Sequence, residues 1–212
     1  MSDRAAADAV VLPMFPLGTV LLPGGRLPLH VFEPRYQALA RHCLARDRRF
    51  GVVLISRGVE VGGGEVRTDH GTVATIDRAV ALPGGRYGLV THGTDRLRVE
   101  HWLPDDPYPQ AAVRVLPADP DPDPAVVRLA ETSVRRAYAL RSELGTGPAW
   151  PADVALPRRP ASAAWLLCEL APVGPHDRQR LLSEDDPNAR LHLLVTLVDA
   201  VAADAARLLA SG

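Results

Sequence analysis

The sequence predicts an α+β protein in which a small β-barrel domain with one helix is followed by a C-terminal four-helix bundle. Before residue 117 the apolar residues fall in many short segments of strand length, and after residue 124 they recur at helical spacing. Between them, residues 116–124 (LPADPDPDP) alternate proline with short residues, which suits neither a strand ladder nor a helix interior. We therefore predict two domains, 10–117 and 124–210.

The first domain begins with a short strand over 26–32, where Pro28 should face a sheet edge. Pro34 suits the first position of the helix that follows, whose apolar residues are spaced for one face. The continuous apolar run 50–55 predicts a strand that is buried on both faces.

The rest of this domain consists of turns and strands. Residues 58–64 form a turn-rich loop, and 72–82 form a strand that ends at the turn 83–85. Segments 87–92 and 95–100 alternate on either side of a glycine, so they are predicted to form a hairpin. A closing strand over 110–116 completes a closed or nearly closed β structure.

Proline and aspartate mark the helix starts of the second domain. Asp123 before Pro124 and Asp186 before Pro187 each place a capping side chain ahead of a proline at the first helical position. Two shorter helices are predicted over 161–170 and 175–183. Four helices of this kind make a small bundle.

Composition excludes several classes of function. The 24 basic residues, all arginine, and 25 acidic residues leave a formal charge of −1, which argues against a nucleic-acid or membrane-surface protein. The absence of lysine removes the P-loop lysine, Schiff-base chemistry and a Ser–Lys pair. The N-terminus has no apolar run typical of a secretory signal, and no segment is long enough to span a membrane. We therefore expect a cytoplasmic protein.

No motif in the sequence points to catalysis, a cofactor or a metal. The histidines include no His-Glu-x-x-His pattern, and the two cysteines lack metal-ligand spacing. The three glycines 62–64 resemble a phosphate loop only superficially, and no Gly-x-Ser-x-Gly elbow occurs. We expect no catalytic, cofactor-binding or metal-binding residues, and hence no enzyme. An enzyme of unfamiliar type would need convergent polar groups in a deep pocket.

Two apolar segments are candidates for binding a polypeptide. The first places Val20, Leu21 and Leu22 beside a loop rich in glycine and proline, where partial exposure would create a contact surface. The alternative is that Val20 and Leu21 form a core strand. The second candidate comprises Phe32, Arg35 and Tyr36, although a buried hinge, with a structural ion pair for the arginine, is the favoured interpretation of that segment.

An ordered set of segments resembles the N-terminal substrate-binding domain of Lon proteases in its stand-alone bacterial form. The matching segments are 12–17 (LPMFPL), 22–24 (LPG), 27–36 (LPLHVFEPRY), 47–55 (DRRFGVVLI), 71–76 (GTVATI), 85–87 (GRY), 93–99 (GTDRLRV) and 107–108 (PY), with 156–157 (LP), 161–170, 177–182 (DRQRLL) and 188–191 (NARL) in the helical half. Together they cover about residues 10–210.

The resemblance implies a PUA-like β domain followed by a helical bundle. It also implies a non-enzymatic polypeptide-binding or adaptor module for unfolded or tagged polypeptides, with a Lon-type protease as a possible partner and oligomerisation as a way to strengthen weak contacts. The ATPase and Ser–Lys peptidase modules of full-length Lon have no counterpart in the matching segments. The alternative is a PUA-like RNA-binding protein, which predicts that Arg26, Arg35, Arg86, Arg96 and Arg98 converge on one face beside an aromatic ring.

Overall fold

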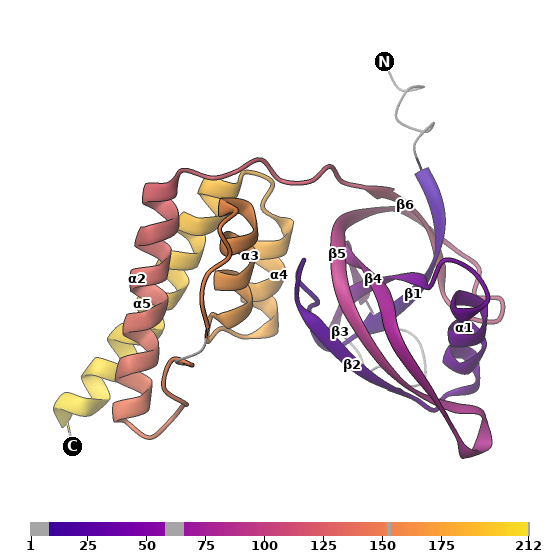
Figure 1. Cartoon of the computed structure of the whole chain (residues 1–212), viewed down its shortest axis with the longest axis horizontal. Coiled ribbons are helices and arrows are strands. Elements are labelled where there is room, and N and C mark those ends of the chain that lie inside the picture. The colour runs from indigo at the N-terminus through magenta and orange to yellow at the C-terminus, as the bar shows by residue number, and fades with distance from the viewer. Residues whose placement is uncertain (1–8, 58–65, 152–153, 212) are drawn as a thin grey trace. The chain divides into compact units, whose positions relative to one another are not determined.

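The chain divides into two compact units in the computed structural model, which describes residues 9–57, 66–151 and 154–211. The first unit is Met1–Ala118 and the second is Asp119–Gly212, so the division falls inside the proline-rich segment (Figure 1). The predicted loop 58–64, including its three glycines, lies outside the described residues. The fold is of mixed α and β type, with a six-stranded sheet in the first unit and helices in both units.

The strands of the first unit pair in a circuit. Their order is β2-β5-β4-β3-β1-β6, and β6 also pairs with β5. The strands β5, β4, β3, β1 and β6 are therefore joined in a closed series of pairings. Among the described strands, β2 is the one outside this circuit, because its pairing is with β5. The elements are β1 (Ala9–Leu17), β2 (Arg26–Val31), α1 (Pro34–Leu44), β3 (Arg49–Arg57), β4 (Val66–Leu82), β5 (Arg86–Leu103) and β6 (Gln110–Val115).

The predicted strands agree best with the structure where the apolar run in the sequence is long. The predicted strand at 50–55 lies within β3, and Phe50 through Leu54 are buried, as expected for a strand covered on both faces. The strand predicted to start at residue 72 is longer, because β4 begins at Val66. Pro28 lies on the edge strand β2, as its missing N–H requires.

Helix α1 covers an apolar cluster of this unit. Pro34 occupies its first turn, and Tyr36, Leu39, Ala40 and Cys43 are buried at helical spacing. They pack with side chains from several strands, and the Tyr36 ring stacks on Phe15 with the ring centroids 4.0 Å apart. A second cluster lies among β1, β3, β4, β5 and β6 and includes Met14, Val53, Val73, Leu97 and Val113.

The predicted hairpin around residue 93 is wrong, because β5 runs without interruption from Arg86 to Leu103. Gly93 makes no turn. It allows the loop before β2 to approach: a Cβ at Gly93 would lie 2.3 Å from the Leu22 carbonyl oxygen. The Gly24 N–H donates to the Gly93 carbonyl at 2.9 Å, and the Gly93 N–H donates to the Gly25 carbonyl at 2.9 Å. A glycine within a strand here marks a close backbone contact.

Strand β1 is absent from the sequence-based assignment. Pro13 and Pro16 interrupt its apolar pattern and remove two ladder donors. The strand nevertheless forms, because its first half pairs with β6 and its second half pairs in parallel with β3. Each half therefore pairs with a neighbour on one side. A proline, which has no N–H to donate, can be accommodated where its nitrogen faces the unpaired side.

The second unit is helical, and each helix begins with proline at its first position. The helices are α2 (Pro124–Glu143), α3 (Pro160–Leu170), α4 (Pro175–Ser183) and α5 (Pro187–Ser211). The predicted caps are present: an Asp123 Oδ1 accepts from the Ala125 N–H at 2.7 Å, and an Asp186 Oδ1 accepts from the Asn188 N–H at 2.7 Å. Helix α2 packs chiefly on α5, while α3 contacts both and α4 contacts α5.

The aspartates of the proline-rich segment are bound to this helical unit. Arg190 is fully buried and donates from Nη1 to Asp119 at 2.5 Å, while its guanidinium lies 3.9 Å from the centroid of the Trp165 ring. An Asp121 carboxylate oxygen accepts from the Ala161 N–H at 3.1 Å. The segment is therefore bonded to the helical unit from residue 119 onward.

Candidate functional site

The outer face of the β2–β5–β4 end of the sheet is the strongest candidate site in the strand unit. Strand register places Pro28, Val90 and Arg78 in one row across the three strands, and His30, Gly88 and Val80 in the next. Because side chains alternate along each strand, all of these share one face. We call these six residues, together with Phe32, the outer sheet face.

The intervening residues hold this end of the sheet on the core. Leu89 is buried, and Leu27, Leu29, Ala79 and Tyr87 pack against the cluster that α1 covers. The inner face therefore resists movement of the three strands. The side chains of the outer face point to solvent from strands that the core holds in place.

Glycine at the centre of the outer sheet face produces a hollow. A Cβ placed on Gly88 would meet nothing within 4 Å, whereas residues of the neighbouring strands rise on both sides of it. The resulting open depression has a volume of about 520 Å³ and is lined by Pro28, His30, Arg78, Val80 and Val90 together with the backbone of β2 and β5. This volume suits an apolar side chain of a bound segment.

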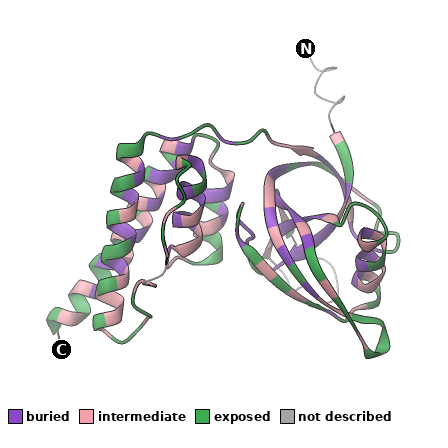
Figure 2. Ribbon diagram, in the orientation of Figure 1, coloured by how far each residue is buried: buried purple, intermediate pink, exposed green. Residues whose placement is uncertain are grey.

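Three apolar side chains on this face are exposed. Phe32 is 55% exposed, Val80 44% and Val90 39%. The His30 and Phe32 rings lie 6.1 Å apart, so the apolar surface continues past the end of β2. Figure 2 shows exposed residues running along the β4–β5 hairpin to its turn. A contiguous exposed apolar surface is typical of a protein-binding site.

The structure corrects the exposure predicted for Val20, Leu21 and Leu22. They are 7%, 4% and 0% exposed, so they belong to the interior and form no contact surface. The Leu21 carbonyl accepts from the Thr72 hydroxyl at 2.6 Å, and the loop after Leu22 is bonded to Gly93. Local sequence could not decide between exposure and burial here, because the cover comes from strands about fifty and seventy residues away.

The second predicted segment divides between core and surface. Tyr36 is buried, and Arg35 donates from Nε to Glu33 at 3.0 Å while its guanidinium lies 4.6 Å from the centroid of the Tyr36 ring. This is the structural arrangement favoured for that arginine. Phe32 alone extends onto the outer sheet face. Val80, Gly88 and Val90 were missed, although the alternation of small and apolar residues in 78–90 was the available signal.

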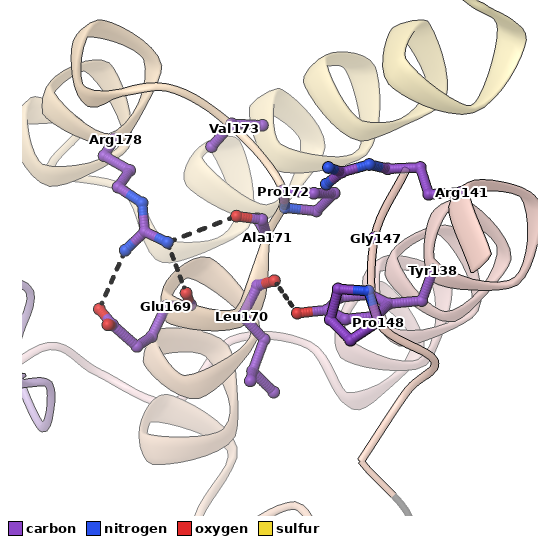
Figure 3. Close-up of a pocket in the computed structure, with 10 residues that line it drawn as sticks. All are labelled: Tyr138, Arg141, Gly147, Pro148, Glu169, Leu170, Ala171, Pro172, Val173 and Arg178. Carbon is purple, nitrogen blue, oxygen red and sulfur yellow. Dashed lines mark hydrogen bonds and ion pairs between the residues drawn. The ribbon is translucent and has the colours of Figure 1, made fainter. Parts of the chain in front are cut away.

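A second pocket, of about 480 Å³, lies in the helical unit, and Figure 3 shows its lining. Arg178 donates to the Glu169 carboxylate at 3.3 Å and to the Glu169 carbonyl at 2.8 Å, closing the C-terminal end of α3. The Tyr138 hydroxyl donates to the Leu170 carbonyl at 2.9 Å. Burial raises the pKa of Glu169 above its ordinary value, and Arg178 partly offsets this rise. These polar groups satisfy one another and join the helices, which is a structural role.

Burial makes both cysteines of the chain poor nucleophiles. Burial raises the pKa of Cys43 and of Cys168 to about 12, so both thiols stay protonated and unreactive at neutral pH. Among residues 9–57, 66–151 and 154–211, no group of three or more His, Cys, Asp or Glu side chains could hold a metal ion. Within the same residues, no helix has the length and apolar character that crossing a bilayer demands.

The five arginines named for RNA binding do not all converge. Arg86 and Arg98 are twelve residues apart on strand β5, which corresponds to roughly 40 Å along the strand. Arg96 is buried, and Arg35 on α1 is bound to Glu33 just before the helix. Arg26 and Arg86 share the outer sheet face, but the set as a whole does not gather there as the RNA-binding alternative required.

Comparison with known proteins gives a consistent family. A sequence model of the ATP-dependent protease La (LON) substrate-binding domain matches residues 11–200. Lon protease from Roseiflexus castenholzii is 27% identical over 196 residues, and Lon protease 2 from Herpetosiphon aurantiacus is 29% identical over 199 residues. The matches cover 89% and 92% of this chain but 24% of each relative, so the chain spans about a quarter of their length.

Solved structures give the same result. A Lon N-terminal domain protein from Xanthomonas campestris is 32% identical, with a TM-score of 0.65, and the match covers 88% of this chain and 98% of that one. The N-terminal domain of a Mycobacterium avium complex Lon protease has a TM-score of 0.61 at 16% identity, which supports the fold alone; it covers 90% of this chain and 98% of that one.

Proposed function

The chain belongs to the family of the ATP-dependent protease La (LON) substrate-binding domain, and we propose that it binds unfolded or tagged polypeptides on the outer sheet face as a non-enzymatic recognition or adaptor module. The observation that carries this proposal is the hollow over Gly88, with exposed Phe32, Val80 and Val90 around it. Unfolded polypeptides expose apolar side chains without a fixed sequence, and an open apolar depression can accept many of them.

The geometry supports weak binding through several contacts. Burying one leucine-sized side chain contributes about 1.5–3 kcal/mol, and association costs consume much of the sum of two or three such contacts. A second copy or a Lon-type protease partner would raise the effective affinity by presenting more than one face. This partner, oligomerisation and a cytoplasmic location are parts of the proposal.

The finer description of the fold also remains a prediction. In this proposal the closed circuit of strands is a PUA-like barrel, and the four helices after Asp123 form a bundle. The match to a substrate-binding domain, rather than to a catalytic one, supports the absence of ATPase and peptidase activity.

Filling the hollow tests the proposal without disturbing the fold. Gly88→Val should weaken binding of a permanently unfolded model polypeptide at least about tenfold, because the valine occupies the space that receives a client side chain. The backbone of Gly88 is outside the left-handed region and valine favours strands, so thermal stability should stay the same or rise by up to about 1 kcal/mol. Fluorescence anisotropy of the labelled polypeptide measures the affinity.

Gly174→Val is the matched control, because it places the same side chain in open space on the helical unit, at a φ of −76°. It should bind the polypeptide like the parent protein. Equal affinity of both variants and the parent would remove the hollow as the binding site.

A further inference from the structure

We infer that the outer sheet face selects polypeptide segments in which a large apolar side chain is flanked by acidic residues. The inference rests on the proposed function, since it names the class of segment that the same face takes. It is carried by three arginines, Arg26, Arg78 and Arg86, that lie on the same face as the hollow.

Basic side chains border the hollow on both sides. Arg78 lies in the row next to Gly88, and Arg86 lies two residues before it on β5, while Arg26 stands two residues before Pro28 on β2. Strand alternation directs all three to the outer face, and all three are exposed. His30 adds a further nitrogen donor or acceptor at the rim.

Acidic side chains are nearly absent from the same area. In β2, in residues 76–82 of β4 and in residues 86–92 of β5, the only carboxylate is that of Asp77. It lies 2.8 Å from Nδ1 of His92 and is thereby engaged. The face therefore combines an apolar centre with an arginine border, to which an acidic segment is complementary.

The guanidinium groups are available for a ligand. The side chains of Arg26 and Arg78 form no hydrogen bond or ion pair with another residue in the described part of the chain. Arg86 donates from Nε to the Pro83 carbonyl at 2.9 Å, and its two terminal nitrogens form no bond with another residue in the described part of the chain. Guanidinium forks bind carboxylates with two parallel hydrogen bonds, so a flanking aspartate or glutamate has a partner on either side of the hollow.

The edge of β2 is a poorer recognition element than the face. Pro28 lies in the middle of this edge strand, and proline on an edge strand discourages pairing of a further strand. The bound segment is therefore expected to lie over the face, with its apolar side chain above Gly88 and its carboxylates toward Arg78 and Arg86.

Three short labelled peptides of equal length test the selectivity. Each carries the same central phenylalanine, flanked by aspartates, by serines or by lysines, and each is titrated with the full chain at low and at physiological ionic strength. Exposed ion pairs contribute modestly, so the aspartate peptide should bind about threefold to tenfold more tightly than the serine peptide. The lysine peptide should bind most weakly, and added salt should reduce both differences.

Matched arginine variants locate the effect. The double variant Arg78→Gln with Arg86→Gln should lose the preference for aspartate, so that it binds the aspartate and serine peptides with equal affinity. Arg98→Gln, an exposed position on the same strand but remote from the hollow, should keep the preference.

The outcomes separate the inference from the proposed function. Equal binding of the three peptides, all weakened by Gly88→Val, would overturn the acidic preference and leave the polypeptide site intact. Peptide binding that is insensitive to Gly88→Val would overturn the proposed function itself. If a single-stranded RNA oligonucleotide displaces the aspartate peptide, and loses its own binding in the double arginine variant, the face is a nucleic-acid site and the inference is overturned.

Discussion

Leu22→Asp is expected to abolish the cooperative thermal unfolding of the strand unit. Leu22 is fully buried, and its carbonyl lies against Gly93 of β5, so that a carboxylate at this position would enter an apolar interior without a partner. An unpaired buried charge destabilises a protein by more than about 4 kcal/mol, which approaches the whole stability of a small domain. Circular dichroism during heating measures the transition.

Phe32→Asp is the matched control for this prediction. It introduces the same charge ten residues away, at a side chain that is 55% exposed, and should melt like the parent while weakening polypeptide binding. If Leu22→Asp also melts like the parent, Leu22 is accessible in solution and the burial described above is contradicted.

Asp119→Ala is expected to destabilise the helical unit by about 3–5 kcal/mol. It would remove an acceptor of the buried Arg190 guanidinium and leave that charge incompletely paired beside Trp165. Arg190 also donates from Nε to the Leu181 carbonyl and from Nη2 to the Glu184 carbonyl, but these acceptors are neutral and cannot compensate its charge. Urea unfolding followed by tryptophan fluorescence measures the loss.

Asp121→Ala is the control, because it removes an acidic residue from the same segment and leaves the buried ion pair in place. Asp121 lies in the same segment, but its side chain is 52% exposed, where it accepts from the Ala161 N–H and lies 3.5 Å from Nε of Arg159. Its removal should cost about 1 kcal/mol. Equal losses for Asp119→Ala and Asp121→Ala would show that the buried pair does not anchor the segment.

Local signals were sufficient for most elements of this fold. Proline after a capping aspartate located the starts of α2 and α5, and the unbroken apolar run 50–55 identified a doubly buried strand. These features act within a few residues, so the sequence alone contains them. Gly93 shows the limit of such local signals. Glycine is favoured both in a turn and where two backbones approach closely, and only the position of Leu22 in the fold shows that Gly93 serves the second purpose.

The candidate site was predicted less well, for a related reason. Exposure depends on what covers a side chain, and Val20, Leu21 and Leu22 are covered by segments distant in the sequence. The hollow over Gly88 likewise depends on β2 and β4 lying on either side of β5. Only Phe32 among the six predicted contact residues projects onto that face, because it continues the outward alternation of β2.

The most direct test of the polypeptide-binding proposal is an NMR titration of the full chain with an unfolded model polypeptide. Binding on the outer sheet face predicts that the amide signals of His30, Phe32, Val80, Gly88 and Val90 shift together as polypeptide is added. The methyl signals of Val80 and Val90 should shift with them. Signals from the helical pocket around Tyr138 and Glu169 should stay in place. Saturable shifts confined to that helical pocket, with the outer sheet face unchanged, would contradict the proposal.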